Sequence, residues 1–467
     1  MPRLKSRYNA LLLLLLICIT LRVDTQYIDI STLFLEKSIV SEEKAAIARE
    51  VDFALQNYGY FITEHPILST ELHFKSITAA ESLFGTAASI KQEYSIKNLK
   101  SFGRGFLPFG AEAGIGSYYE VKEGFSYGYP GVEKKSPSSS SNSDNSITDI
   151  RRHPMQQENI WPPFIHSSEN QHSLDQLFFE KANFCKLILS LLADHVMQDN
   201  RDDENYIPSS FDHYINHDVD GGETISLMRI FHYLSNFTNS PDVFSSTSGV
   251  DSLNRTIIGS SPHTDWGVLT VITFNGVAGL QFYNRISGLW EDLVVPSHVR
   301  NPVIINAGDY LKLVSGNRYH SPVHRVLCPK STSVPLLSDD DDDVGGFSVD
   351  ESRNRISFVF FYYPRPDTLL PSISTAPSSK NDKETRGTCE GRDKDESGSC
   401  GKNVNVNVDG DFNGKIVSRE VNGHFEDFEF NTLLNLESSS SSSLSSTSGT
   451  NITFGDYIMA KWKGVYH

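Results

Sequence analysis

Seven short, strand-like segments follow one another between residues 223 and 363, and they constrain the fold more than any other feature of the chain. Each is rich in β-branched and aromatic residues, and Gly, Pro and Asn lie between them. Short strands at such close spacing predict a β-sandwich or a jelly-roll barrel. In chain order the segments are ETISLMRIFHYL, VLTVITF, LQFYN, WEDLVV, PVIINA, YHSPVHRVL and RISFVFFYY.

Two stretches with helical periodicity precede these strands. Residues 41–59, SEEKAAIAREVDFALQNYG, begin with a capping serine and acidic residues and end at a glycine, and residues 174–197 form a second, longer stretch. Such capping and terminal residues mark the ends of helices. We therefore expect an α+β, mostly β fold, in which a double-stranded β-helix (jelly-roll) core carries the N-terminal helices on its outside.

Four low-complexity stretches interrupt the chain, and they contain too few apolar residues to form a core. Such stretches are typical of disordered surface loops. Strand-like segments resume directly after them, which indicates insertions into one domain, and lengthening a surface loop costs little free energy. The four stretches are residues 133–146, 338–352, about 374–416 and 437–449.

This pattern divides the chain into five predicted parts. The parts are a signal peptide or signal anchor (1–25), an N-terminal helical region (26–220) with a disordered insertion (133–150), a jelly-roll core (221–370) with an acidic insertion (331–352), a mostly disordered insertion (371–449) and a C-terminal helix (450–467).

The first 25 residues have the layout of a targeting segment. A basic start precedes an apolar stretch from Ala10 to Leu21, which is short for a membrane span but suits a signal peptide or an uncleaved anchor. We expect entry into the secretory pathway, with the endoplasmic reticulum lumen, a plastid reached through it, or the outside as destination. A cytoplasmic protein is the alternative if the segment is not a working signal. No other stretch is apolar enough for a membrane helix, so any membrane contact would be through this segment.

Charge and cysteine usage narrow the function further. The formal net charge of −17 argues against a nucleic-acid-binding surface, although the run Asp339–Asp343 accounts for part of it and is expected to be solvated. Cys185 and Cys328 lie in apolar surroundings and are expected to be core thiols, whereas Cys389 and Cys400 flank a polar loop and could form a disulfide in an oxidising compartment. None of the cysteines has a zinc-ligand spacing.

A histidine and an aspartate stand two residues apart in PHTDWGVLTVI (262–272). In an extended chain, residues i and i+2 face the same side, so His263 and Asp265 can point at one spot. His324, in a later strand, supplies a possible third group. Two histidines and one carboxylate form the facial triad of non-haem Fe(II) oxygenases, which leaves coordination positions open for oxygen and a co-substrate. The alternative is a hydrogen-bonded His–Asp pair at a strand end, and for His320 we favour a solvated or supporting role.

The strand RNRISFVFFYYP (353–364) repeats this spacing with other groups. Arg355 and Ser357 are two residues apart and therefore share a face. A guanidinium and a hydroxyl together make a good receptor for a carboxylate. The alternative is a surface strand with the arginine in solvent. The apolar run that follows argues against a strand face that is fully exposed to solvent.

These residues match the H-x-D…H…R-x-S pattern of the Fe(II)/2-oxoglutarate-dependent dioxygenases, and the chain resembles their isopenicillin-N-synthase-like branch. The resemblance extends over most of the chain outside the four insertions. The further matching segments are YIDISTLF (27–34), FALQNYGYFITEH (53–65), GRGFLPFGAE (103–112), VKEGFSYG (121–128), NIWPP (159–163) and FGDYIMAKWKGVY (454–466).

The resemblance implies a role for each matching residue. His263, Asp265 and His324 would bind Fe(II), while Arg355, Ser357 and Tyr233 would hold the distal carboxylate of 2-oxoglutarate. Substrate-selecting residues would come from residues 103–128, from the strand with Tyr233 and from the terminal helix.

Two departures from the family pattern are visible. Phe231 stands two residues before Tyr233, where family members often have Asn, and the 31 residues from His324 to Arg355 make an unusually long interval. The first departure puts one co-substrate contact in doubt. The second is tolerable if the acidic insertion loops outward.

The implied function is that of a dioxygenase that uses Fe(II), 2-oxoglutarate and O2, supported by ascorbate. It would hydroxylate or desaturate a small organic molecule and release succinate and CO2, acting as a monomer. One alternative is an Fe(II)-dependent oxidase that does not use 2-oxoglutarate, as isopenicillin N synthase is. The other is a non-catalytic binding protein on the same fold.

Overall fold

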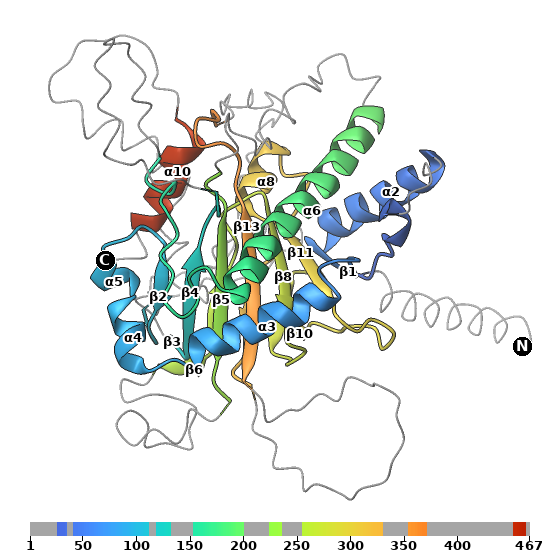
Figure 1. Ribbon diagram of the computed structural model, residues 1–467. Helices are drawn as coiled ribbons and strands as arrows, with labels where there is room; N and C mark the ends of the chain where they lie inside the picture. Colours follow the sequence, from blue (N-terminus) through green and yellow to red (C-terminus); the bar gives the residue numbers. More distant parts are fainter. Residues whose placement is uncertain are drawn as a thin grey trace, which may run out of the picture.

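The computed structural model describes eight parts of the chain, and every structural statement below concerns these parts (Figure 1). The predicted targeting segment, the four predicted insertions, Cys389 and Cys400 lie outside them. Among the described residues, no helix combines the length and the apolar character that a membrane crossing needs. The described parts are residues 26–34, 41–111, 118–131, 153–199, 224–235, 255–329, 354–370 and 452–463.

Two antiparallel sheets form the core. The larger sheet has seven strands in the order β1-β11-β8-β13-β5-β4-β2, and the smaller has four in the order β10-β9-β12-β7. The strands of the larger sheet are β1 (Tyr60–Thr63), β11 (Val303–Ala307), β8 (Leu269–Phe274), β13 (Arg355–Tyr362), β5 (Leu227–Tyr233), β4 (Lys122–Tyr127) and β2 (Gly105–Leu107). Those of the smaller sheet are β10 (Leu289–Asp292), β9 (Leu280–Asn284), β12 (His324–Val326) and β7 (Ser260–His263). A parallel pair, β3 (Tyr118–Glu120) and β6 (Thr256–Ile258), lies beside them.

Strand register places the polar residues of the larger sheet in rows. Tyr233 of β5 lies directly between Lys122 of β4 and Arg355 of β13. Two residues along, Phe231 of β5 lies opposite Ser357 of β13. Because side chains alternate across a strand, both rows point to the same face, and that face is turned toward the smaller sheet.

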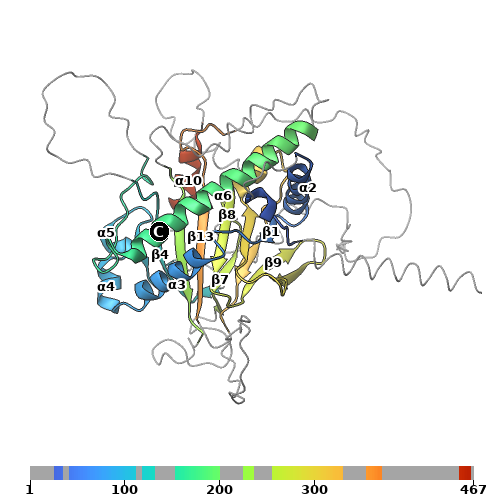
Figure 2. The same ribbon diagram turned by 45° about the vertical axis from the view of Figure 1, so that its right-hand side comes forward.

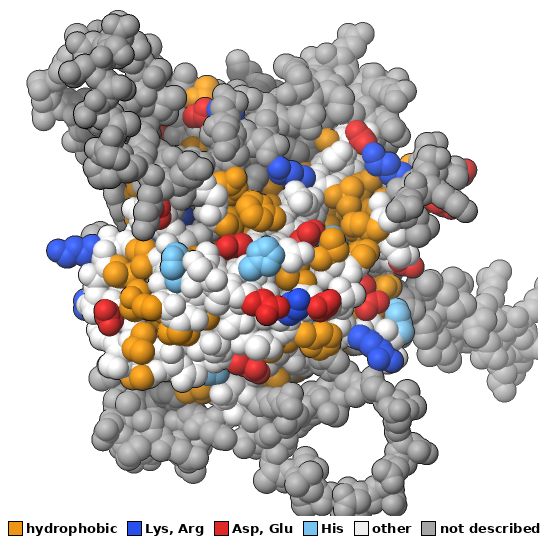
Figure 3. Space-filling model, in the orientation of Figure 1, with side chains coloured by type: hydrophobic (Ala, Val, Ile, Leu, Met, Phe, Trp, Pro, Cys, Tyr) orange, Lys and Arg blue, Asp and Glu red, His pale blue; other side chains and the backbone are white. Residues whose placement is uncertain are grey.

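Helices cover the opposite face of the larger sheet. In both ribbon views α3 (Glu71–Phe84) and α6 (Glu169–Asp199) run across this face, and α2 (Ser41–Asn57) lies beside α6 (Figures 1 and 2). Charged and hydrophobic side chains alternate on the solvent side of this layer (Figure 3). The remaining helices are short: η1 (Ser31–Phe34), α4 (Ala88–Glu93), α5 (Ile96–Leu99), α8 (Asp309–Val314) and α10 (Phe454–Lys463).

Two hydrophobic clusters hold these layers together. The larger cluster lies between the helices and the seven-stranded sheet, and a smaller one, which includes Phe282 and Ile304, lies between the two sheets. Within the larger cluster, the fully buried Lys181 of α6 donates to the carbonyl oxygens of Val271 (3.2 Å) and Phe358 (2.7 Å). Because these carbonyls belong to β8 and β13, the lysine fixes α6 against the centre of the sheet.

The predicted fold class is confirmed: the core is a jelly roll with helices outside it. All seven predicted strands are present, although YHSPVHRVL is a strand only over His324–Val326. The predicted N-terminal region is not purely helical, because it contributes β1, β2 and β4 to the larger sheet. Residues on both sides of position 220 therefore build one sheet. Cys185 is buried as expected, whereas Cys328 is only partly buried.

Candidate active site

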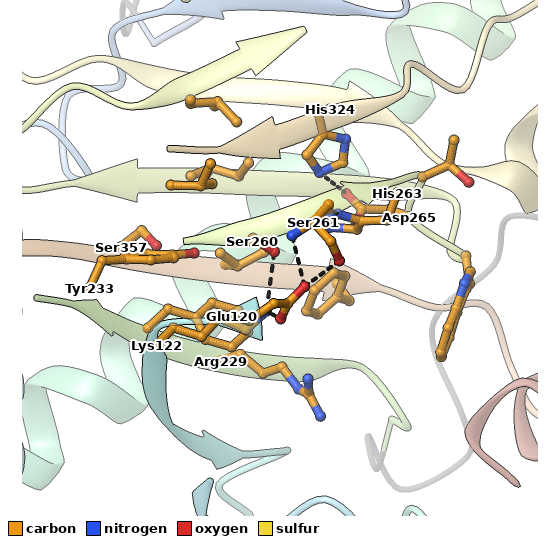
Figure 4. Close-up of a pocket in the computed structure, with 18 of the residues that line it drawn as sticks. Glu120, Lys122, Arg229, Tyr233, Ser260, Ser261, His263, Asp265, His324 and Ser357 are labelled. Atoms are coloured by element: carbon orange, nitrogen blue, oxygen red, sulfur yellow. Dashed lines mark hydrogen bonds and ion pairs between the residues drawn. The ribbon is translucent and has the colours of Figure 1, made fainter. Parts of the chain in front are cut away.

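A cavity between the two sheets brings the predicted site residues together (Figure 4). His263, Asp265 and His324 gather on one side of it, while Tyr233 and Ser357 lie at the other end, with Glu120 and Lys122 between the two groups. All six predicted site residues line this cavity: His263, Asp265, His324, Tyr233, Arg355 and Ser357. The predicted metal ligands therefore belong to the smaller sheet or the loop after it, and the predicted carboxylate receptor belongs to the larger sheet.

The strand pairing explains why the two histidines meet. β7 pairs with β12 so that His263 lies directly opposite His324, and their ring centroids are 4.3 Å apart. Asp265 follows β7 by two residues. Its Oδ1 is 3.9 Å from His263 Nε2, and its Oδ2 is 3.8 Å from His324 Nε2. One ligand atom from each residue lies within 4.8 Å of the other two.

Both imidazole rings are oriented by backbone carbonyls two residues upstream. His263 Nδ1 is 2.7 Å from the carbonyl oxygen of Ser261, and His324 Nδ1 is 3.1 Å from that of Pro322. A protonated Nδ1 therefore donates to the backbone in each ring, and the unprotonated Nε2 faces Asp265. Metal-binding histidines are commonly held in this way.

The carboxylate of Asp265 is held in place as well. Asn306 Nδ2, on β11, donates to Asp265 Oδ2 at 2.8 Å. Burial alone would raise the pKa of Asp265, but the facing imidazoles of His324 and His263 and this hydrogen bond bring that pKa below its usual value. Burial, followed by the neighbouring His324, lowers the pKa of His263 to about 4. At neutral pH His263 is therefore a neutral imidazole and Asp265 a carboxylate, which are the protonation states that metal binding requires of these two residues.

This donor set fits a divalent transition metal. Bonds from such a metal to nitrogen and oxygen are about 2.0–2.2 Å long, so two ligands at right angles would be about 3 Å apart. The observed separations of 3.8 and 3.9 Å can close to this value by side-chain movements of less than about one ångström. The three donors all approach from one side, which leaves the cavity side open, as in the facial triad of Fe(II) oxygenases.

The carboxylate receptor is the most strongly buried charge in the cavity. Arg355 is 1 % exposed, and its Nε and Nη1 have no hydrogen-bond partner among the described residues. The guanidinium carbon lies 5.2 Å from the ring centroids of both Tyr233 and Phe274. Burial lowers the pKa of Arg355. Because a buried cation without a counter-ion is costly, this geometry points to an anion that arrives with a ligand.

Part of the remaining cavity wall comes from the segments expected to select the substrate. The wall includes Glu120, Lys122, Arg229, Phe231, Trp266 and Trp462. The sequence indicated these segments but did not mark the individual side chains within them, whereas Trp266 lies outside the segments, directly after Asp265. Phe231 lies where the family often has an amide, so that hydrogen-bonding contact is absent from this position.

Two residues close to His324 in the sequence, His320 and Arg325, do not line the cavity. His320 precedes β12, and burial, followed by the nearby charges of Arg285 and Lys312, lowers its pKa to about 3. Arg325, next to His324, points away from the cavity: its Nε donates to Gln281 (2.8 Å), and its guanidinium stacks on Trp290 at 4.1 Å.

The comparisons with known proteins agree with this geometry. Residues 225–364 match the model of the 2OG-Fe(II) oxygenase superfamily. Among curated proteins, the chain is 23% identical to a probable iron/ascorbate oxidoreductase of Dictyostelium discoideum, over 84% of this chain and 92% of that one. It is 27% identical to the 2-oxoglutarate-Fe(II) type oxidoreductase hxnY of Emericella nidulans, over 71% of this chain and 77% of that one.

Solved structures share the fold. A full-length protein of Neurospora crassa, crystallised in complex with alpha-KG, has a TM-score of 0.50 and 19% identity, covering 76% of this chain and 89% of that one. A 2OG-Fe(II) oxygenase family protein of Caulobacter crescentus has a TM-score of 0.51 and 18% identity, covering 77% and 93%.

A jelly roll that carries two histidines and an aspartate beside a buried arginine is typical of the non-haem Fe(II) oxygenases. Within this class, residues 225–364 of the chain match the domain of the 2OG-Fe(II) oxygenase superfamily.

Proposed function

We propose that this protein is an Fe(II)- and 2-oxoglutarate-dependent dioxygenase that oxidises a small organic molecule and releases succinate and CO2. The observation that carries the proposal is the placement, in one cavity, of a His–Asp–His donor set and a buried guanidinium that lacks a counter-ion among the described residues. The donor set suits Fe(II), and the guanidinium suits the far carboxylate of a dicarboxylic keto acid. Ascorbate would support activity by keeping the iron reduced.

Each half of the cavity has its own task. His263, Asp265 and His324 would hold the iron, which supplies the oxygen chemistry that amino-acid side chains lack. Arg355 would anchor the distal carboxylate of 2-oxoglutarate, with Ser357 and Tyr233 beside it. The chain's own contribution is placement: it fixes the keto acid between the two sheets and directs its other end toward the three ligands.

The part of the cavity wall formed by Trp266, Trp462 and Arg229 suits a small organic substrate. Trp266 and Trp462 meet edge to face with their ring centroids 5.3 Å apart, and the guanidinium of Arg229 lies 4.6 Å from the Trp462 ring. Such a wall can pack against a compact apolar or ring-shaped molecule and exclude water from the reacting atoms. Relatives named for small-molecule oxidation, such as the clavatol oxidase of Penicillium crustosum at 23% identity, support this scale of substrate.

The test is an anaerobic titration of Fe(II) and 2-oxoglutarate into protein that lacks residues 1–25. We expect the weak visible charge-transfer band of a keto acid chelated to iron. The band should be lost in an Arg355→Met variant that still binds Fe(II). Iron binding without the band in the parent protein would favour the oxidase that does not use 2-oxoglutarate, and no iron binding would favour a non-catalytic protein.

Substrate-dependent oxygen uptake then separates an enzyme from a binding protein, and succinate release separates the two kinds of enzyme. Arg355 calls for a carboxylate in the cavity, because its charge has no counter-ion among the described residues. Both 2-oxoglutarate and a substrate that carries a carboxylate meet this need, so succinate release decides between the two kinds of enzyme.

We also propose that the protein enters the secretory pathway and works as a monomer. The apolar stretch Ala10–Leu21 after a basic start supports the first part. A fusion of residues 1–25 to a fluorescent protein should direct it to the endoplasmic reticulum, and cytoplasmic fluorescence would contradict this. Light scattering during gel filtration should give the mass of one chain.

A further inference from the structure

A buried ion pair lies between the two halves of the cavity, and neither the metal site nor the carboxylate receptor accounts for it. Glu120 is 4 % exposed and ends β3, and Lys122 begins β4. Lys122 Nζ lies 2.9 Å from Glu120 Oε2. Two buried charges are expensive to desolvate, and a buried ion pair is weak evidence for stability. We therefore look for a role of this ion pair, other than stability, that a pair of apolar residues could not perform.

Glu120 and Lys122 both form hydrogen bonds to β7, the strand that ends at the predicted metal ligand His263. Glu120 Oε1 accepts hydrogen bonds from the backbone N–H (2.7 Å) and the hydroxyl of Ser261, and Lys122 Nζ is within 3.1 Å of Ser260 Oγ (Figure 4). Both serines belong to β7, which ends at His263. The ion pair thus connects the end of β3 and the start of β4 to β7 of the smaller sheet.

β7 needs this support because of its place in the sheet. It is the end strand of the four-stranded sheet, and its register with β12 is irregular between Ser260 and His263. Residue 262 is a proline, which has no N–H to donate. The carboxylate of Glu120 therefore stands where a neighbouring strand would otherwise hold Ser261.

Ser261 in turn sets the orientation of His263. Its carbonyl oxygen receives the hydrogen bond from His263 Nδ1 at 2.7 Å, which turns Nε2 toward Asp265. Packing contributes less to this ring than to the other one, since the side chain of His263 is 33% exposed and that of His324 is 5% exposed. The position of His263 consequently depends on the backbone of Ser261.

We propose that Glu120, held by Lys122, is a positioning residue for the iron ligand His263. It acts through Ser261: the carboxylate fixes the Ser261 backbone, and the Ser261 carbonyl fixes the imidazole with its Nε2 facing the metal. This inference rests on the proposed function for the identity of the metal. It predicts that metal affinity depends on a carboxylate that does not touch the metal.

The test compares metal affinity in the full chain and in variants. The probes are Fe(II) under anaerobic conditions, in competition with a chromophoric chelator, and Co(II), whose visible absorption reports ligand geometry. Loss of an outer hydrogen-bond partner of a metal ligand typically costs 10–100-fold in affinity. Glu120 is one hydrogen bond further from the metal, so we expect a loss near the lower end of this range, about 10-fold, for Glu120→Ala, and a smaller loss for Glu120→Gln because the amide oxygen can still accept from Ser261.

Glu123→Gln is the matched control. Glu123 is 6 % exposed and belongs to a similar buried network, with Lys91 at 3.0 Å and His232 at 2.9 Å, but these partners lie on α4 and β5, and Glu123 does not line the main cavity. Both glutamate variants should lower the melting temperature, since each leaves a cation without its partner. Only the Glu120 variants should weaken metal binding and change the Co(II) spectrum.

The outcomes separate this inference from the function it rests on. Equal metal affinity in the parent and both Glu120 variants would overturn the positioning role alone. An equal loss of affinity in Glu123→Gln would also overturn it, because the effect would then follow from stability. If Glu120→Ala does not fold, the Glu120→Gln result decides by the same criteria. A parent protein that binds neither metal would overturn both the inference and the proposed function.

Discussion

Replacing Arg355 by methionine should have opposite effects on the ligand-free protein and on ligand binding. In the structure the guanidinium is 1 % exposed, and two of its three nitrogens have no partner among the described residues. Methionine has a similar length and carries no charge. The variant therefore removes a buried charge without a counter-ion and leaves little empty volume. We expect the ligand-free variant to be as stable as the parent protein or more stable.

Binding of 2-oxoglutarate should change in the other direction. A hydrogen bond to a charged group contributes about 1.5–3 kcal/mol, and a guanidinium can form two such bonds with a carboxylate. Loss of about 3–4 kcal/mol corresponds to a decrease in affinity of roughly 100- to 1000-fold. At a 2-oxoglutarate concentration 100 times its dissociation constant, the parent protein gains about 2.7 kcal/mol of stability, and the variant should gain almost none at that concentration.

Thermal unfolding with Mn(II) as an inert metal, with and without 2-oxoglutarate, measures both effects. The reasoning is refuted if the ligand-free variant is markedly less stable than the parent, because Arg355 would then have a structural partner. It is also refuted if 2-oxoglutarate raises the melting temperature of the variant as much as that of the parent. An Arg355→Lys variant should recover part of the ligand effect, since lysine keeps the charge but not the paired geometry.

Three further predictions concern the metal site and the core. Asp265→Ala should abolish Fe(II) binding and turnover while the circular dichroism spectrum stays that of the parent; unchanged iron affinity would contradict the ligand assignment. Asn306→Ala removes the 2.8 Å hydrogen bond to Asp265 and should weaken Fe(II) binding by about 10–100-fold, which chelator competition would measure; full affinity would show that Asp265 is held by other contacts. Burial lowers the pKa of His65 and of His73 to about 4. Between pH 6.5 and 4 the unfolded chain therefore takes up protons that the folded chain does not. The free energy of unfolding should fall as the pH falls through this range, by at most roughly 3 kcal/mol for each group. Urea unfolding at several pH values in this range measures the fall in stability. The His73→Gln variant should show a weaker pH dependence of the free energy of unfolding, and an unchanged pH dependence would contradict the assignment to His73.

The parts of the site that could be predicted from sequence are those that local spacing determines. His263 and Asp265 are two residues apart at a strand end, as are Arg355 and Ser357 within β13, and a strand places such pairs on one face whatever the rest of the fold does. The helices at Ser41–Asn57 and Glu169–Asp199 could be predicted for the same reason, since their periodicity is local, whereas the closing helix Phe454–Lys463 was expected only from the family resemblance.

Contacts between distant segments could not be predicted in this way. Glu120 and Ser261 are 141 positions apart, and nothing in the sequence YEVKEG marks its first glutamate as a partner of β7 and its second as a partner of His232. The strands β1 to β4 were missed, although several strands that were predicted, such as β10 and β12, are equally short. They become strands by pairing with β5, β6 and β11. Their strand conformation therefore depends on these partners more than on their own sequences.

The division of the site between two sheets explains why the chain can carry a long insertion in the sequence between two of its site residues. His324 lies in β12, which is paired with β7 and β9, and Arg355 lies in β13, which is paired with β5 and β8. β12 and β13 share no ladder, so the 31 residues that separate the two side chains do not set their relative position. The packing of the two sheets sets it instead. A connection whose length does not enter the site geometry can grow at little cost, and for this reason the unusual interval is compatible with an intact ligand set.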